Sequence, residues 1–63
     1  MGKVTKREIV EEISKHPGTA HVANMTQKAL RGEITLDRAL HETAQHADTL
    51  YAKNLAEKAI DGG

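Results

Sequence analysis

Apolar residues recur at helical spacing in three stretches of the chain. Residues 6–16 place Ile9, Val10 and Ile13 on one face. Residues 20–31 carry apolar residues three, four and one positions apart, which matches a 3.6-residue period. The third stretch, residues 36–60, contains neither Gly nor Pro and holds six of the nine alanines. The pattern predicts three helices, at about 6–16, about 20–31 and about 36–60.

Residues that favour helix ends bound these stretches. A threonine stands where each helix should begin, and its hydroxyl can accept a hydrogen bond from the backbone of the first turn: Thr5, Thr19 and Thr35. Glu8 follows Thr5 by three residues, which is the spacing of a capping box. Pro17 disfavours helical geometry at the residue before it, and Gly32 suits the position just past a helix. These signals predict where the first two helices stop.

The third helix is the largest element that the pattern predicts. At about 1.5 Å per residue, residues 36–60 would span roughly 37 Å, far more than either neighbour. Asp48 and Thr49 both favour helix caps, so the alternative is a break near Asp48, with that residue capping a fourth helix. No internal repeat is evident. The predicted fold class is all-α: one helical domain over residues 1–63, a small bundle of two short helices and one long (or broken) C-terminal helix.

The composition leaves few ways to stabilise so short a chain. It has 63 residues, no Cys, Phe or Trp, and nine of its 24 hydrophobic residues are Ala. Small scaffolds usually need a disulfide, a metal or a partner chain, and the lack of Cys excludes a disulfide. We therefore expect a homodimer or another protein partner. No apolar run reaches the length of a signal peptide or a membrane span, which predicts a cytoplasmic protein that does not contact a membrane.

The C-terminal part of the long helix is the predicted interface. Leu50, Tyr51 and Leu55 continue its apolar stripe where the two shorter helices should no longer cover it. Three alanines form a second, low-profile face that would let another helix approach closely. The alternative is that Ala, the best helix former, simply fills an exposed face. The predicted partner or dimer interface comprises Leu50, Tyr51, Ala52, Leu55, Ala56, Ala59 and Ile60.

The distribution of charge suggests an alternative function. The formal net charge is zero, but residues 1–31 carry +3 and residues 32–63 carry −3. A basic half can mark a nucleic-acid surface, although the two halves can also simply attract each other. Residues 9–18 resemble the opening of helix-turn-helix proteins, and residues 5–10 look like the start of bacterial histone-like proteins, whose strands cannot be read here after Gly32. The alternative is a small DNA-binding regulator that uses Lys3, Lys6, Arg7, Lys28 and Arg31.

Histidine supplies the only site chemistry that the sequence suggests. His41 and His46 bracket a segment similar to the zincin motif, but they stand five residues apart, whereas that motif needs two His four apart on one helix face. His16 and His21 flank the Pro-Gly turn, and two His alone make a weak site. We therefore expect ordinary surface histidines, no metal site and no cofactor. The alternatives are a metal-binding His cluster and a pH-sensitive interface.

Catalysis finds no support in the sequence. The chain has no Cys nucleophile and no Gly-rich phosphate loop, and its one serine, Ser14, lies among Glu and Lys residues. We predict that the protein is not an enzyme. The predicted function is a non-catalytic helical protein–protein interaction or regulatory module that associates with itself.

Overall fold

Four helices make up the part of the chain that the structure describes, residues 4–62 of a computed structural model. They are α1 (Lys6–Lys15), α2 (Ala20–Leu30), α3 (Leu36–His46) and α4 (Leu50–Gly62). No residue between 4 and 62 belongs to a β-strand. The all-α bundle predicted from the sequence is confirmed, whereas the predicted count of three helices is wrong.

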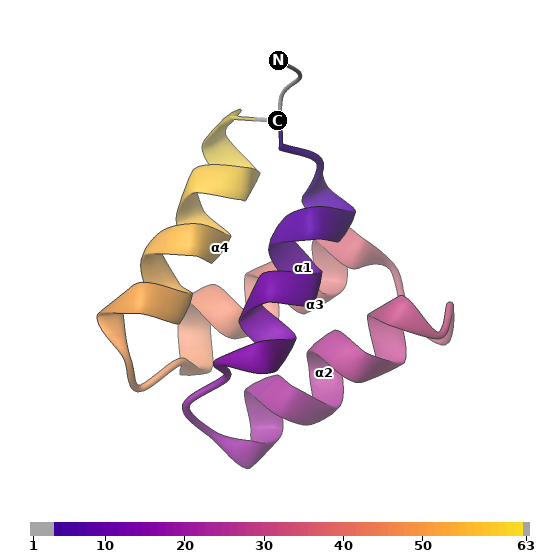
Figure 1. Ribbon diagram of the computed structural model, residues 1–63, viewed down its shortest axis with the longest axis horizontal. Helices are drawn as coiled ribbons and strands as arrows, with labels where there is room; N and C mark the ends of the chain where they lie inside the picture. The colour runs from indigo at the N-terminus through magenta and orange to yellow at the C-terminus, as the bar shows by residue number, and fades with distance from the viewer. Residues whose placement is uncertain (1–3, 63) are drawn as a thin grey trace.

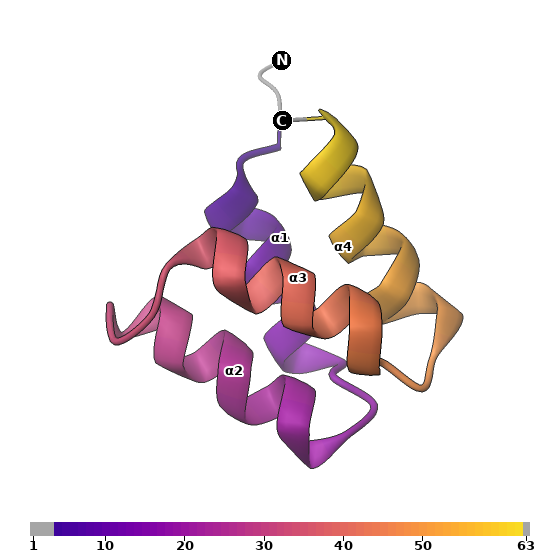
Figure 2. The ribbon, with the colours of Figure 1, turned by 180° about the vertical axis from the view of Figure 1, so that it is seen from behind.

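The two odd-numbered helices lie at the centre of the bundle. α1 lies in front of α3 in Figure 1, and Figure 2 shows the same pair from behind. α2 and α4 flank this pair, and each of them contacts both α1 and α3. Across residues 4–62, the two outer helices make no contact with each other. The first and second halves of the chain therefore occupy equivalent places in the bundle.

Threonine caps fix the starts of the first three helices, as the sequence predicts. The Glu8 N–H donates to Thr5 Oγ1 at 3.1 Å, and the Thr5 N–H donates to Glu8 Oε1 at 2.9 Å, which completes the capping box. Thr19 and Thr35 accept backbone hydrogen bonds in the same way at the starts of α2 and α3. α1 ends before Pro17, so this helix stop is also confirmed.

The predicted long C-terminal helix is broken, and this corrects the fold prediction. α3 ends at His46, and Ala47 adopts an extended backbone with φ −68° and ψ 138°. A new helix follows Thr49, whose hydroxyl accepts a hydrogen bond from the Ala52 N–H at 3.3 Å. The fourth helix is thus capped by Thr49 rather than by Asp48. The break lets α4 fold back on α3 while both helices contact α1. One straight helix could not bring its own two halves into contact.

The chain contains an internal repeat whose two copies are offset by 30 residues, so the expectation that it has no internal repeat is wrong. α1 and α3 begin 30 residues apart, and so do α2 and α4. Residues 5–32, the first repeat, are identical to residues 35–62, the second repeat, at eight of 28 positions. Each repeat is one helical hairpin, and the two hairpins together enclose a single core.

Buried residues follow the same 30-residue shift. The first repeat buries Ile9, Val10 and Ile13 from α1, and Val22, Thr26 and Ala29 from α2. The second repeat buries the six equivalent residues: Ala39, Leu40, Thr43, Ala52, Ala56 and Ala59. The two buried threonines donate to carbonyls of their own helices, Thr26 to Val22 at 2.9 Å and Thr43 to Ala39 at 2.8 Å. Their hydroxyls are therefore satisfied inside the core.

The two hairpin turns lie side by side at one end of the bundle. Gly18, in the first turn, has a φ of 82°, a conformation that glycine adopts without steric cost. A Cβ on Gly18 would lie 2.8 Å from Asp48 Oδ1 and 3.0 Å from Thr49 Cγ2 in the second turn. We call this region, residues 16–21 and 46–51, the two-turn end.

Candidate functional site

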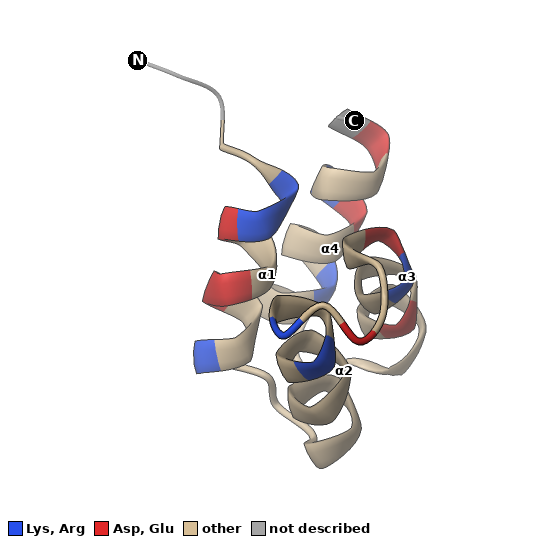
Figure 3. Ribbon diagram, turned by 90° about the vertical axis from the view of Figure 1, so that its right-hand side faces the viewer, with Lys and Arg blue, Asp and Glu red and all other residues tan. Residues whose placement is uncertain are grey.

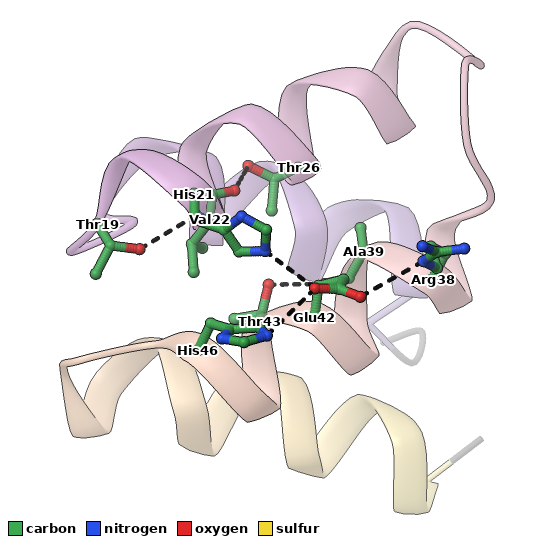
Figure 4. A network of polar contacts seen from close by, with 9 residues as sticks. All are labelled: Thr19, His21, Val22, Thr26, Arg38, Ala39, Glu42, Thr43 and His46. Carbon is green, nitrogen blue, oxygen red and sulfur yellow. Dashed lines mark hydrogen bonds and ion pairs between the residues drawn. The ribbon is translucent and has the colours of Figure 1, made fainter.

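Two histidines of the two-turn end meet a glutamate of α3 where α2 packs on α3 (Figure 4). His21 Nε2 lies 3.0 Å from Glu42 Oε1, and His46 Nε2 lies 3.5 Å from the same oxygen. The two imidazoles meet edge to face, with ring centroids 4.8 Å apart. One ligand atom from each of the three residues lies within 4.8 Å of the other two. We call these three residues the His–Glu–His cluster.

Helix geometry brings the cluster together. Glu42 and His46 stand four residues apart, so they project from the same face of α3. His21 stands in the first turn of α2, where Thr19 Oγ1 accepts a hydrogen bond from the Val22 N–H at 3.2 Å. Val22 is fully buried in the core. The cap and the buried valine together hold the first turn of α2 against the end of α3.

The Glu42 carboxylate is stabilised in its charged form. Its hydrogen bond with His21 lowers the pKa of Glu42 below the ordinary value of 4.5, burial raises that pKa, and the nearby His46 and Arg38 lower it further. Arg38 Nε lies 3.5 Å from Glu42 Oε2. The guanidinium therefore contacts one carboxylate oxygen, while both imidazoles approach the other.

A second cluster occupies the equivalent place on the other side of the two-turn end. The 30-residue shift relates Glu42 to Glu12, His46 to His16 and His21 to Tyr51. The Tyr51 hydroxyl donates to Glu12 Oε2 at 2.6 Å, and His16 Nε2 lies 3.8 Å from the same oxygen. The His16 and Tyr51 rings also meet edge to face, 5.8 Å apart. We call Glu12, His16 and Tyr51 the twin cluster.

The two clusters differ in the chemistry of one residue. An imidazole nitrogen is a good ligand for zinc and related ions, whereas a phenol must lose its proton before it can bind a metal strongly. The hydrogen bond to Glu12 raises the pKa of Tyr51 above its ordinary value of 10.0, so its hydroxyl stays protonated at neutral pH. The His–Glu–His cluster thus offers three metal ligands, and the twin cluster offers two.

The structure places the histidines differently from the sequence analysis. His41, half of the apparent zincin-like segment, is exposed and lies outside both clusters. His16 and His21, which flank the same turn, belong to different clusters. The signal that could have revealed both sites is a Glu four residues before a His, which occurs at 12–16 and again at 42–46. This Glu–His spacing becomes informative only once the 30-residue repeat is recognised.

The predicted interface residues fall into two groups. Ala52, Ala56 and Ala59 are buried in the core of the chain itself, and Leu55 and Ile60 pack partly buried against it. Leu50 and Tyr51, by contrast, are 73% and 50% exposed. In the folded protein, only Leu50 and Tyr51 of the predicted interface expose much surface to a partner. The break at Ala47 changes the helical phase, so the apolar stripe of α3 does not continue through residues 50 and 51.

The basic residues predicted to contact nucleic acid are mostly paired with carboxylates. Lys6 Nζ lies 2.7 Å from Asp37 Oδ1, a contact that lowers the pKa of Asp37. Arg7 pairs with Glu11, and Arg31 pairs with Glu33. Lys28 is exposed, and Lys3 lies outside the described residues. Figure 3 shows basic and acidic positions interspersed along α1 and α3 rather than a single basic face in that view.

Two broader findings complete the description. None of the helices in residues 4–62 is both long enough and apolar enough to cross a membrane. Comparisons with protein-family models, with curated protein sequences and with solved structures each found no match. The functional argument therefore depends on the geometry of the two-turn end.

Proposed function

We propose that the protein is a non-catalytic helical interaction module that binds protein through its two-turn end. The observation that carries this proposal is the exposure of Leu50, at 73%, beside Tyr51, at 50%. Aromatic residues such as Tyr are enriched at protein interfaces, and the buried centre of an interface is more apolar than its rim. In the folded chain, these two residues take the place of the wider surface that the sequence predicts.

The rest of the two-turn end suits such an interface. Three of the four histidines, His16, His21 and His46, belong to the two-turn end and have side chains about half-exposed, and the His16 ring meets the Tyr51 ring edge to face. A standard interface buries about 800 Å² on each partner, roughly a fifth of the 4075 Å² of accessible surface of this chain. A partner must therefore cover most of one end of the bundle, and at the two-turn end an exposed apolar residue, Leu50, stands next to an exposed aromatic residue, Tyr51.

Self-association is the simplest form of this proposal, and Leu50→Ser tests it. Leu50 is exposed, so its replacement should leave the fold intact, and Val4→Ser is a matched control because Val4 is also a large exposed apolar residue, at 65%. Sedimentation equilibrium should give a mass above that of one chain for the wild type and the control, and the monomer mass for Leu50→Ser. A wild type that stays monomeric at every concentration would contradict self-association.

A different protein partner requires a second experiment. The wild type and Leu50→Ser can each be immobilised and exposed to nuclease-treated extract of the source cells. A specific partner should bind to the wild type and not to Leu50→Ser. If the wild type and Leu50→Ser have the same mass in sedimentation and bind the same proteins from the extract, Leu50 has no role in binding and the proposal fails.

The DNA-binding alternative and the cytoplasmic location both remain predictions. Ion pairs at Lys6, Arg7 and Arg31 reduce the positive charge available to phosphates. Binding to DNA should weaken steeply with added salt, because it releases counterions, whereas binding through Leu50 should not. Retention on DNA at low salt is the measurement that would revive the alternative.

A further inference from the structure

We propose that His21, Glu42 and His46 form a binding site for a divalent transition-metal ion of the zinc type. The proposal is independent of protein binding at Leu50. It starts from the identity of the ligands, since two imidazoles and a carboxylate are a common set for zinc. The three residues come from two helices of different repeats, so only the folded chain brings them together.

The distances fit a metal site after a small adjustment. Zinc–ligand bonds of about 2.0–2.2 Å place the ligand atoms of a tetrahedral site roughly 3.3–3.6 Å apart. The cluster already has separations of 3.0 Å and 3.5 Å from Glu42 Oε1 to the two imidazoles, and no pair of ligand atoms is more than 4.8 Å apart. Both histidine side chains are half-exposed, so rotation of a ring can close the remaining gap without disturbing the core.

The surroundings of Glu42 also suit a metal ligand. Outer groups that hydrogen-bond a ligating carboxylate fix its orientation and tune its affinity for metal. Arg38 lies beside Glu42 Oε2 at 3.5 Å, on the oxygen away from the imidazoles. Three protein ligands leave the fourth position of a tetrahedral ion to water. The site is therefore open to solvent, as its half-exposed histidines require.

Comparison with the twin cluster distinguishes two explanations of the His–Glu–His cluster: a metal site, or a polar contact that only holds two helices together. Tyr51 joins its helix to Glu12 by a hydrogen bond of 2.6 Å with no second imidazole, so this position needs only one polar side chain to link the helices. His21→Tyr would copy that arrangement into the His–Glu–His cluster. The variant keeps a donor for Glu42 while removing one metal ligand, so it separates loss of metal binding from loss of the fold.

The experiment titrates Zn²⁺ into the untagged full chain by isothermal calorimetry. The wild type should bind one ion. His21→Tyr and His46→Gln should each lose more than about 100-fold in affinity, which exceeds the roughly 10–100-fold that outer-shell changes usually cost. His41→Gln, which changes an exposed histidine outside the cluster, and His16→Gln, which changes the residue equivalent to His46, should both bind like the wild type.

The reverse exchange gives a gain of binding. Tyr51→His would complete a second set of ligands with Glu12 and His16, so this variant should bind two ions. Co²⁺ provides an independent readout, because its absorption bands in the visible range report imidazole and carboxylate ligands in a four- or five-coordinate site. Bound metal should also raise the thermal midpoint of the wild type, since an ion that binds only the folded chain stabilises it, and should leave that of His21→Tyr unchanged.

Several results would overturn the proposal. A wild type that binds no Zn²⁺ would show that the cluster is a hydrogen-bonded contact like its twin. Equal Zn²⁺ affinity in the wild type and His21→Tyr, with both proteins folded by circular dichroism, would place the ion elsewhere. A single bound ion in Tyr51→His would show that the ligand set does not decide binding at these positions.

Discussion

The two repeats have the same helices and caps but contribute unequally to the core. At five of the six equivalent buried positions the first repeat carries a side chain at least as large as the second: Ile9/Ala39, Ile13/Thr43, Val22/Ala52, Thr26/Ala56 and Ala29/Ala59. The exception is Val10, which is smaller than its equivalent Leu40. The core of this small domain is thus filled mainly by one hairpin, and the small residues of the other let the helices approach closely.

The two hairpin turns also differ: the first contains residues that stop a helix, and the second does not. The first turn contains Pro17, which disfavours helical geometry at the residue before it, and Gly18, which adopts a positive φ without steric cost. The second turn contains Ala47 and Asp48 at the equivalent positions, and neither residue excludes a helix. Two repeats with the same structure can therefore differ in how clearly their sequences predict the turn.

A charge in the core of the second repeat should have the largest effect. Ala56 is fully buried, so Ala56→Glu would place a carboxylate without a partner in the core. We expect the variant to be unfolded at room temperature by circular dichroism. Ala20→Glu makes the same change at an exposed alanine of the first repeat and should alter the free energy of unfolding by no more than about 0.5 kcal/mol. A folded Ala56→Glu would mean that the small residues of the second repeat are not tightly packed.

Truncation at equivalent positions compares the two repeats directly. Ile13→Ala removes a fully buried aliphatic side chain, and such changes cost about 2–5 kcal/mol. Thr43→Ala, at the equivalent position, removes fewer atoms and a hydrogen bond within its own helix, so we expect about 1 kcal/mol. Urea denaturation measures both. Equal losses would show that the two repeats contribute equally to the core.

Substitution of two glycines distinguishes the cost of backbone strain from the cost of crowding between the two turns. Gly18 and Gly32 both have positive φ, 82° and 84°, but a Cβ meets the second turn only at Gly18. Gly32→Ala should cost about 1–2 kcal/mol, the cost of left-handed backbone for a residue with a side chain. Gly18→Ala should cost about 1 kcal/mol more through overpacking against Asp48 and Thr49. Asp48→Ala should recover part of that difference, and identical losses at both glycines would mean that the turns do not touch.

The smallest predicted effect concerns acid and Glu42. The folded pKa of Glu42 lies below its ordinary value of 4.5, mainly through its hydrogen bond with His21. Its charged form therefore adds stability above about pH 4.5, and that contribution disappears as the pH falls through the folded pKa. In a carbon-13 titration, the Glu42 carboxyl should ionise at lower pH in the wild type than in His21→Ala. The same midpoint in both proteins would contradict this account of the cluster.

Local signals in the sequence predicted the helix starts well. Thr5, Thr19 and Thr35 were identified as caps because a hydroxyl before an apolar stripe has one strong local use. From the sequence, a break near Asp48 is only an alternative, because Asp48 and Thr49 favour caps but the alanine-rich segment contains no Gly or Pro that would exclude a helix. What breaks it is the gain from packing both segments against α1, and this gain depends on contacts far apart in the sequence.

The candidate site was harder to predict than the fold. The spacing of His41 and His46 concerns a single helix, whereas the cluster pairs His46 with Glu42 and adds His21 from another helix. One continuous helix would place Ala52, Ala56 and Ala59 on a surface, whereas the break changes the helical phase and these residues are buried. Once the 30-residue repeat is recognised, the burial of those alanines and the equivalence of His21 and Tyr51 follow from the first hairpin.

The order of helix contacts also has a kinetic consequence. Three of the helix pairs in contact are neighbours along the chain, and only the contacts of α1 with α3 and α4 join distant segments. Such local topology allows helical bundles to fold within microseconds to milliseconds. Because the first hairpin carries four of the five large apolar side chains that are buried in the core, we expect it to form first and α4 to dock last. The amide protons of α4 should then exchange with solvent sooner than those of α1, so the protein would open and close from its C-terminal helix.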